Sequence, residues 1–130
     1  MIRWIWVWGP AVAMMAAIFY ASSIPDLSAL PGGISDKVGH FVGYALLGGL
    51  VLRAFAGAHV AGAKASTAWI ALAISVAYGA SDEGHQHFVR VRTPDVNDLA
   101  ADAIGAAVAI AVCWLLTAAV RARRAQRGEV

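Results

Sequence analysis

Most acidic side chains of this 130-residue chain stand in or beside two stretches that join its apolar segments. Seven of the eight Asp and Glu residues do so: Asp26, Asp36, Asp82, Glu83, Asp95, Asp98 and Asp102. Carboxylates close to a histidine such as His40 can hold a divalent cation, move a proton or accept hydrogen bonds from a ligand. Ionisable groups at the edge of a membrane cost free energy, so their gathering indicates a functional site.

Three predicted helices carry such polar residues at intervals of four, which places each set on one helix face. The sets are Asp36, His40 and Tyr44; Asp82 and Gln86; and Asp98 and Asp102. Glu83 lies one position round from the second set. We expect the three helices to bring these groups to one depth, with Arg92 reaching their carboxylates from a short linker.

Each residue also has a simpler explanation when it is taken alone. Asp36 can cap a helix, with His40 as an interface residue, and Asp95 complements a helix dipole. His85 and His87 are two residues apart, so a helix points them in different directions and a shared metal ion is not expected. The group as a whole favours a functional cluster over a purely structural network, because intramembrane ionisable residues usually serve a function.

Four apolar segments are expected to position these residues. The chain is 60% apolar and 14% charged, far from the composition of a soluble globular domain. Because a transmembrane helix needs about 20 residues, four spans use most of the chain, and we predict a single all-α transmembrane domain, a four-helix bundle. Its helices are predicted over residues 4–21, 35–55, 65–88 and 94–119, followed by a basic cytoplasmic tail at 120–130. These ranges form one domain over residues 1–130.

Local signals refine these helices. Thr93 and Pro94 predict the start of the last helix, with Thr as N-cap and Pro at the first position. Glycines in the second segment predict close helix contacts. The first segment is expected to be a retained helix and not a cleaved signal peptide, since its tryptophans suit a membrane interface. The single cysteine, Cys113, excludes an intrachain disulfide.

The distribution of Lys and Arg predicts the orientation. With the N-terminus in the cytoplasm, seven of the ten cations lie inside, and only Lys37, Arg90 and Arg92 lie outside. We therefore predict that both termini are inside and that the polar cluster faces the outer, periplasmic or extracellular side. Nucleic acid is not an expected partner, because no aromatic or structured basic element accompanies the basic tail.

Two stretches carry a family resemblance: Asp36-Lys-Val-Gly-His40-Phe in the second predicted helix, and the region from Ser81 through Gly105. They resemble the VanZ family of small bacterial membrane proteins. The matching residues are Asp36, Lys37, His40, Phe41, Asp82, Glu83, Gln86, Arg92, Asp98 and Gly105. Asp102 stands where the family usually has Asn, and Arg90-Val91 replaces a frequent Pro-Gly. The resemblance implies a multi-pass protein of the bacterial inner (cytoplasmic) membrane, associated with teicoplanin resistance.

The leading hypothesis is that the protein engages a lipid head group or a lipid-linked cell-envelope component at the outer leaflet. Its expected partners are membrane lipids or a lipid-linked cell-wall precursor, and an oligomer is compatible with the sequence. Lys37 and Arg92 are expected to contact phosphate, and any effect on teicoplanin tolerance is then indirect. The full set of expected binding residues is Asp36, Lys37, His40, Asp82, Glu83, Gln86, Arg92, Asp98 and Asp102.

Other functions stay open. An intramembrane hydrolase or transferase acting on a lipid or cell-wall precursor would use His40 and Glu83 as candidate catalytic residues, so the sequence does not decide whether the protein is an enzyme. A divalent metal is its candidate cofactor, with ligands among Glu83, Asp98, Asp102 and His40. An ion-coupled transporter is disfavoured, because the cytoplasmic halves of the helices offer no polar path. A structural scaffold, in which the polar network fixes the helix register, is the remaining alternative.

Overall fold

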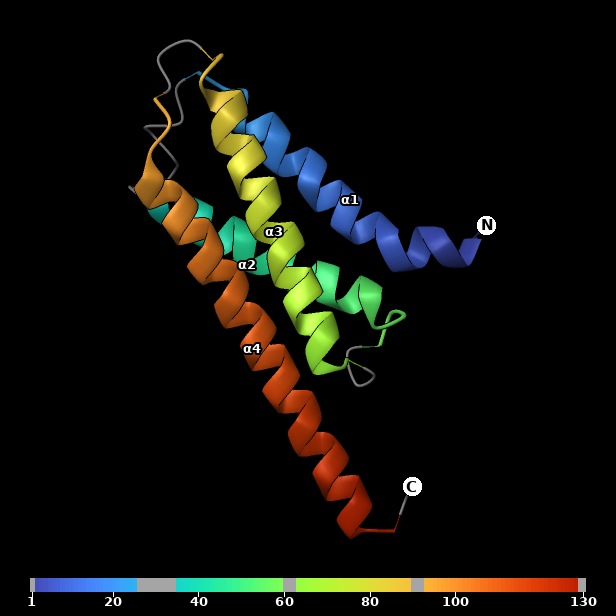
Figure 1. The fold of residues 1–130 in the computed structure, drawn as a ribbon. Coiled ribbons are helices and arrows are strands. Elements are labelled where there is room, and N and C mark those ends of the chain that lie inside the picture. The colour runs from blue at the N-terminus through green and yellow to red at the C-terminus, as the bar shows by residue number, and fades with distance from the viewer. Residues whose placement is uncertain (1, 26–34, 60–62, 90–92, 129–130) are drawn as a thin grey trace.

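Four α-helices make up the secondary structure of the described residues. The computed structural model describes residues 2–25, 35–59, 63–89 and 93–128. The helices are α1 (Ile2–Ser22), α2 (Asp36–Phe55), α3 (Ala65–Gln86) and α4 (Val96–Gln126), which confirms the predicted all-α, four-helix class. Successive helices alternate in direction (Figure 1). The C-terminal ends of α1 and α3 therefore meet the N-terminal ends of α2 and α4, and we call this the polar end of the bundle.

Three of the four helices are long and apolar enough to cross a membrane: α1, α2 and α4. The 22 residues of α3 extend about 33 Å, which matches the hydrocarbon thickness. This helix is nevertheless less apolar than a predicted membrane span, and it is not among the three candidate spans. Its polar residues Ser75, Asp82 and Glu83 lie buried against the other helices. Three helices therefore have the composition of the four apolar spans that were expected. Helix α3 differs because part of its length consists of polar residues that are buried inside the protein.

The ends of α4 differ from the prediction. The helix begins at Val96, and its N-cap is Asp95, whose side chain accepts a hydrogen bond from the Asn97 N–H at 2.8 Å. Thr93 and Pro94 therefore precede the helix, since Asp is the stronger N-cap. At the other end the helix continues to Gln126, well past the expected limit near residue 119, because the Ala and Arg residues there are good helix formers.

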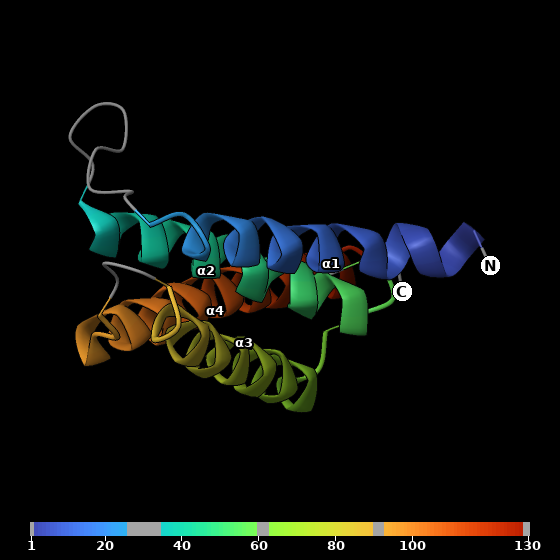
Figure 2. The ribbon, with the colours of Figure 1, turned by 90° about the horizontal axis from the view of Figure 1, so that it is seen from above.

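Helix α2 packs closely on α4 through glycines. A Cβ at Gly48 would lie 2.9 Å from the Cα of Ala106, and one at Gly105 would overlap the carbonyl oxygen of Phe41. Small residues at such a crossing let two backbones approach, which is how membrane helices gain packing energy. Seen from above, α1 and α2 overlap on one side of the bundle and α3 lies on the other side, with α4 passing between them (Figure 2). The crossing fixes the depth at which residues of α2 meet residues of α4.

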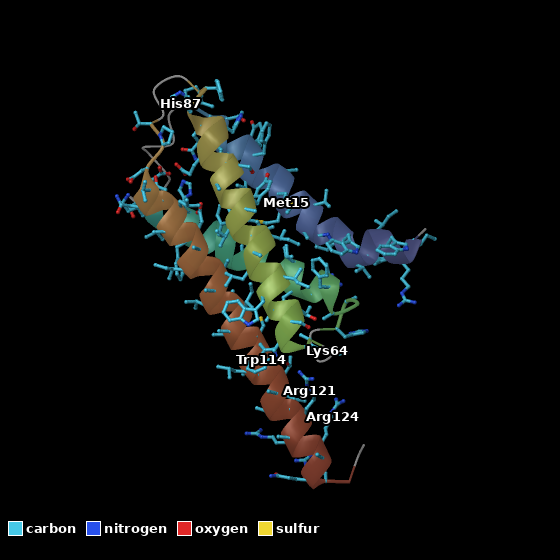
Figure 3. All side chains as sticks on the ribbon, viewed as in Figure 1. Met15, Lys64, His87, Trp114, Arg121 and Arg124 are labelled. Atoms are coloured by element: carbon cyan, nitrogen blue, oxygen red, sulfur yellow. The ribbon has the colours of Figure 1, made fainter. Side chains whose placement is uncertain are left out.

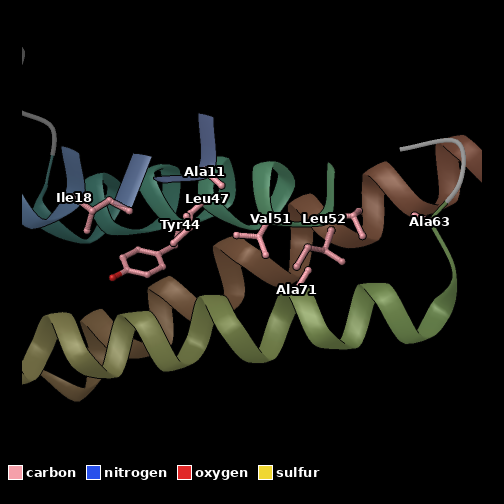
Figure 4. Close-up of a cluster of buried hydrophobic side chains, with 9 residues drawn as sticks. Ala11, Ile18, Tyr44, Leu47, Val51, Leu52, Ala63 and Ala71 are labelled. Atoms are coloured by element: carbon pink, nitrogen blue, oxygen red, sulfur yellow. The ribbon is translucent and has the colours of Figure 1, made fainter. Parts of the chain in front are cut away.

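The hydrophobic core lies along this crossing (Figure 4). Leu47, Val51 and Leu52 of α2 pack there with Ala71 of α3, and all four are almost fully buried. Tyr44 closes the core at one side, and its hydroxyl points along the bundle toward the polar end (Figure 4). The apolar core therefore passes directly into the region that holds the ionisable residues.

Basic residues gather at the opposite end of the bundle. Lys64, Arg121 and Arg124 lie far from His87, which marks the polar end (Figure 3). Arg53 joins α2 to α1 at the basic end and donates a hydrogen bond to the carbonyl of Trp6 at 3.1 Å. This carbonyl lacks its usual helical donor, because Pro10, four residues on, has no N–H.

Candidate functional site

A buried histidine–aspartate pair joins α2 to α4 at the polar end. His40 Nδ1 lies 2.9 Å from Asp102 Oδ1, and the side chains are 8% and 0% exposed. The second oxygen of Asp102, Oδ2, has no hydrogen-bond partner. It packs toward α3, since a Cβ built on Gly79 would lie 3.0 Å from it. The pair therefore keeps one free acceptor at the boundary between α3 and α4.

Glu83 of α3 reaches the same place. Its Oε2 accepts a hydrogen bond from the Asp95 N–H at 2.9 Å, whereas its Oε1 has no partner. His40, Glu83 and Asp102 each offer one ligand atom, and these three atoms lie within 4.8 Å of one another. Three residues singled out in the sequence thus meet in space, from three different helices, and Glu83 and Asp102 each have one oxygen without a hydrogen-bond partner.

A second group of buried polar atoms lies on α3 and α2. Asp82 is 3% exposed, and neither of its oxygens accepts a hydrogen bond. The Tyr44 hydroxyl interacts with this carboxylate through its charge and as a weak hydrogen bond, whose geometry falls short of an ordinary hydrogen bond. Gln86 is 2% exposed, and its Nε2 also lacks a partner. Since an unpaired buried polar group costs about 1–3 kcal/mol, these atoms indicate a missing partner.

Lys37 forms ion pairs at the rim of this region. Its Nζ lies 2.8 Å from Asp95 Oδ2 and 3.1 Å from Asp98 Oδ1. The hydrogen bond from Lys37, together with those from Asn97, lowers the pKa of the Asp95 carboxyl to about 2. Lys37 is largely exposed, so its ion pair with Asp95 adds little to the stability of the fold. The pair nevertheless engages the Lys37 ammonium group, which is then not free to bind another anion.

The remaining predicted residues fall into two groups. Asp36 is exposed at the start of α2, and its carboxylate belongs to a second set with His40 and Asp98, whose ligand atoms also lie within 4.8 Å of one another. Arg92, which was expected to reach the carboxylates, lies outside the described residues, as do Asp26 and Arg90.

The two histidines near the end of α3 point to different surroundings. His85 Nε2 lies 3.0 Å from the Ser23 hydroxyl, and its ring stacks on Phe19 at a centroid distance of 4.4 Å. His87 is exposed and contacts Phe88. His85 therefore ties α3 to α1, and it takes no part in the group around Asp102.

A cavity of about 210 Å³ lies between α1 and α2, beside the buried carboxylates. Met14, Ala17, Ile18 and Ala21 of α1 form one wall, with Gly39 and Gly43 of α2 opposite. Its polar lining is Ser22, Asp36, His40, Tyr44 and Asp82. We call this space the α1/α2 cavity. No sequence pattern predicts this cavity, because the α1 residues that line it are mostly apolar and resemble ordinary membrane-facing positions.

Comparison with known protein families gives one match. The family model described as VanZ/LLP1 matches residues 5–117, a range that covers most of α1 and α4 and all of α2 and α3. This match confirms the resemblance seen in the second helix and around the third linker. Neither the curated proteins nor the solved structures contain a significant match.

Proposed function

Since this chain belongs to the VanZ/LLP1 family of multi-pass membrane proteins, we propose that it binds a lipid or a lipid-linked envelope component in the α1/α2 cavity. The observation that carries the proposal is the cavity itself. Its apolar walls lead to Asp82, a buried carboxylate without a hydrogen-bond partner. A lipid suits both features, because its chains fit the apolar walls and the hydroxyl or ammonium groups of its polar part can donate to the carboxylate.

The charges around the cavity favour a head group that carries hydrogen-bond donors. Asp82 lines the cavity and is buried, and no Lys or Arg of the described residues pairs with it, so a phosphate beside it would meet a like charge. Lys37 already pairs with Asp95 and Asp98, so its charge is compensated. We therefore expect Asp82 to recognise the ligand, and Lys37 to meet a phosphate only at the rim and only by releasing a carboxylate.

We also propose four crossings of the bacterial inner membrane, with both termini in the cytoplasm. Lys64, Arg121 and Arg124 lie at the end away from the cavity (Figure 3), and cationic residues favour the cytoplasmic side. The cavity then opens toward the outer leaflet, where lipid-linked cell-wall precursors are also found. An effect on teicoplanin tolerance would be indirect, through the lipid or precursor that is bound.

Native mass spectrometry of the protein released from nanodiscs tests this proposal. The nanodiscs contain equal amounts of phosphatidylethanolamine, whose ammonium has N–H donors, and phosphatidylcholine, whose quaternary nitrogen has none. The wild type is expected to retain phosphatidylethanolamine preferentially. Asp82→Asn keeps the size of the side chain and is expected to lower this retention about tenfold or more, because a hydrogen bond to a charged group contributes about 1.5–3 kcal/mol.

Two glycine variants of α2 provide a matched control. Gly43→Leu places a side chain in the cavity, near Ile18 and Met14, and is expected to abolish lipid retention. Gly49→Leu lies on the same helix, where a Cβ meets nothing within 4 Å, and is expected to behave as the wild type. Equal retention by the wild type, Asp82→Asn and Gly43→Leu would contradict lipid binding in this cavity and would favour the structural scaffold.

A further inference from the structure

We propose that His40, Glu83 and Asp102 form a binding site for one divalent transition-metal ion, of the Mn²⁺ or Zn²⁺ kind, between α2, α3 and α4. Each residue offers one ligand atom, and the three atoms lie within 4.8 Å of one another. The site differs from the lipid-recognition group, which centres on Asp82. The metal-binding proposal can therefore be tested separately from the lipid-binding proposal.

The hydrogen bonds around the three residues leave ligand atoms free. Glu83 Oε2 is held by the Asp95 N–H and Asp102 Oδ1 by His40, whereas Glu83 Oε1 and Asp102 Oδ2 have no partner. Glu83 is 7% exposed and Asp102 is fully buried, so water does not readily compensate these oxygens. Each carboxylate is thus oriented by one oxygen and has the other available, which is the usual arrangement of a metal ligand supported by its surroundings.

The balance of buried charge also calls for a cation. Asp82, Glu83, Asp98 and Asp102 are all buried at the polar end. Within the described ranges, Lys37 pairs with Asp98, and no Lys or Arg forms an ion pair with Asp82, Glu83 or Asp102. Asp102 has the hydrogen bond with His40, which compensates its charge only when the imidazole is protonated. A buried carboxylate without compensation is costly. A divalent ion between Glu83 and Asp102 would neutralise two negative charges at once.

A glycine on α3, Gly79, allows α3 to approach Asp102 of α4 closely. Gly79 stands one helical turn before Glu83, and a Cβ there would lie 3.0 Å from Asp102 Oδ2 and 3.3 Å from Leu99 Cδ1. Any larger residue would push the Asp102 carboxylate away from α3. The glycine therefore allows the α3 and α4 ligands to approach each other.

The donor set selects the kind of metal. One imidazole nitrogen with two carboxylates suits Mn²⁺ or Zn²⁺ better than Mg²⁺ or Ca²⁺, which prefer oxygen ligands alone. The alternative set of Asp36, His40 and Asp98 is weaker, since Asp36 is exposed and Asp98 is already paired with Lys37. Three protein ligands leave coordination positions open for water or a ligand. Because His40 also lines the α1/α2 cavity, such a ligand can approach from the cavity.

Titration of the metal-free protein with Mn²⁺, followed by electron paramagnetic resonance, tests the site. The protein is held in nanodiscs of phosphatidylcholine, a zwitterionic lipid without net charge, so that anionic lipids do not compete for the ion. The wild type is expected to bind about one Mn²⁺ per chain in a saturable manner. Glu83→Gln and Asp102→Asn are expected to weaken binding at least about tenfold, as loss of a ligand does.

Asp82→Asn is the matched control, because it removes a buried carboxylate adjacent in sequence to Glu83 but outside the ligand set. It is expected to weaken Mn²⁺ binding clearly less than Glu83→Gln does, since a neighbouring charge attracts the ion through space but supplies no ligand atom. Loss of binding equal to that of Glu83→Gln would show diffuse attraction by the acidic cluster and would overturn the site. Absence of saturable binding by the wild type below millimolar Mn²⁺ would also overturn it.

A measurement on the wild type alone covers the case in which the ligand variants fail to fold. Electron spin-echo modulation of bound Mn²⁺ is expected to show a directly coordinated imidazole nitrogen from His40. Bound Mn²⁺ without nitrogen coordination would contradict the proposal. Retention of phosphatidylethanolamine by Glu83→Gln, with Mn²⁺ binding retained by Asp82→Asn, would separate the two sites and leave both proposals in place.

Discussion

The surroundings of Asp82 distinguish the hypothesis of a ligand-binding site from that of a purely structural network. It is buried, neither of its oxygens accepts a hydrogen bond, and it lines the α1/α2 cavity. Asp102, which is also buried, instead pairs with His40. A structural network is expected to satisfy its members, whereas a binding site keeps an atom ready for its ligand at a cost in stability.

This difference gives a prediction for the free energy of unfolding in a detergent that does not supply the ligand. Asp82→Asn is expected to leave it unchanged or to raise it by about 1–2 kcal/mol, because an uncompensated charge is removed. Asp102→Asn is expected to lower it by about 1–3 kcal/mol, because the bond to His40 is weakened. Unfolding monitored by circular dichroism measures both. A marked loss of stability in Asp82→Asn would favour the scaffold.

Asp95 links the rim of the site to its interior. Its N–H donates to Glu83, and its carboxylate accepts hydrogen bonds from Lys37 and Asn97. Its lowered pKa, about 2, means that ionised Asp95 stabilises the fold above the ordinary value of 3.8, and that this contribution is lost as the pH falls toward 2. The Asp95 carboxylate therefore stays ionised throughout the physiological range.

At the scale of the helices, the crossing of α2 and α4 decides which residues meet. Gly48 and Gly105 let the two backbones touch, and this contact sets the register that brings His40 opposite Asp102. The glycines of α2 predicted a close contact from the sequence. Their partner on α4 and the resulting register depend on how both helices rotate, which no local pattern specifies.

Replacing Gly105 with Ala tests this contact. The added methyl group would overlap the Phe41 carbonyl oxygen, so the variant is expected to lose about 1–3 kcal/mol of stability through overpacking. Gly49→Ala is the control, because a Cβ there meets nothing within 4 Å. Thermal unfolding in detergent compares the two. A Gly105→Ala protein as stable as Gly49→Ala would show that the helices do not cross in this way.

Across the whole molecule, the features predicted correctly from the sequence are those that depend on composition and on the spacing of residues along a helix. Apolar runs of about 20 residues predicted four helices. Intervals of four predicted polar helix faces that bring His40 and Asp102 to one depth. The cap of α4 at Asp95 was missed, because Thr93 and Pro94 form a common helix-start pattern just before it. The cavity was also missed, since Met14 and Ile18 carry no signal that separates a cavity wall from a membrane-facing surface.

The bundle thus has two unlike ends. One end gathers buried carboxylates, a histidine and a cavity, and the other carries basic residues such as Arg121 (Figure 3). This asymmetry suits a protein that is fixed in one orientation and recognises a ligand from one leaflet. We propose that this ligand is a lipid, held between α1 and α2.

Photo-crosslinking from the methionines of α1 tests that claim most directly. Both Met14 and Met15 pack partly against the hydrophobic core, but of the two it is Met14 that lines the cavity. Photo-methionine is incorporated, and the protein is irradiated in membranes that contain phosphatidylethanolamine and phosphatidylcholine. We predict phosphatidylethanolamine adducts at Met14, few at Met15, and their loss at Met14 in Asp82→Asn. Met14 adducts that reflect the bulk lipid composition and persist unchanged in Asp82→Asn would contradict lipid recognition in the cavity.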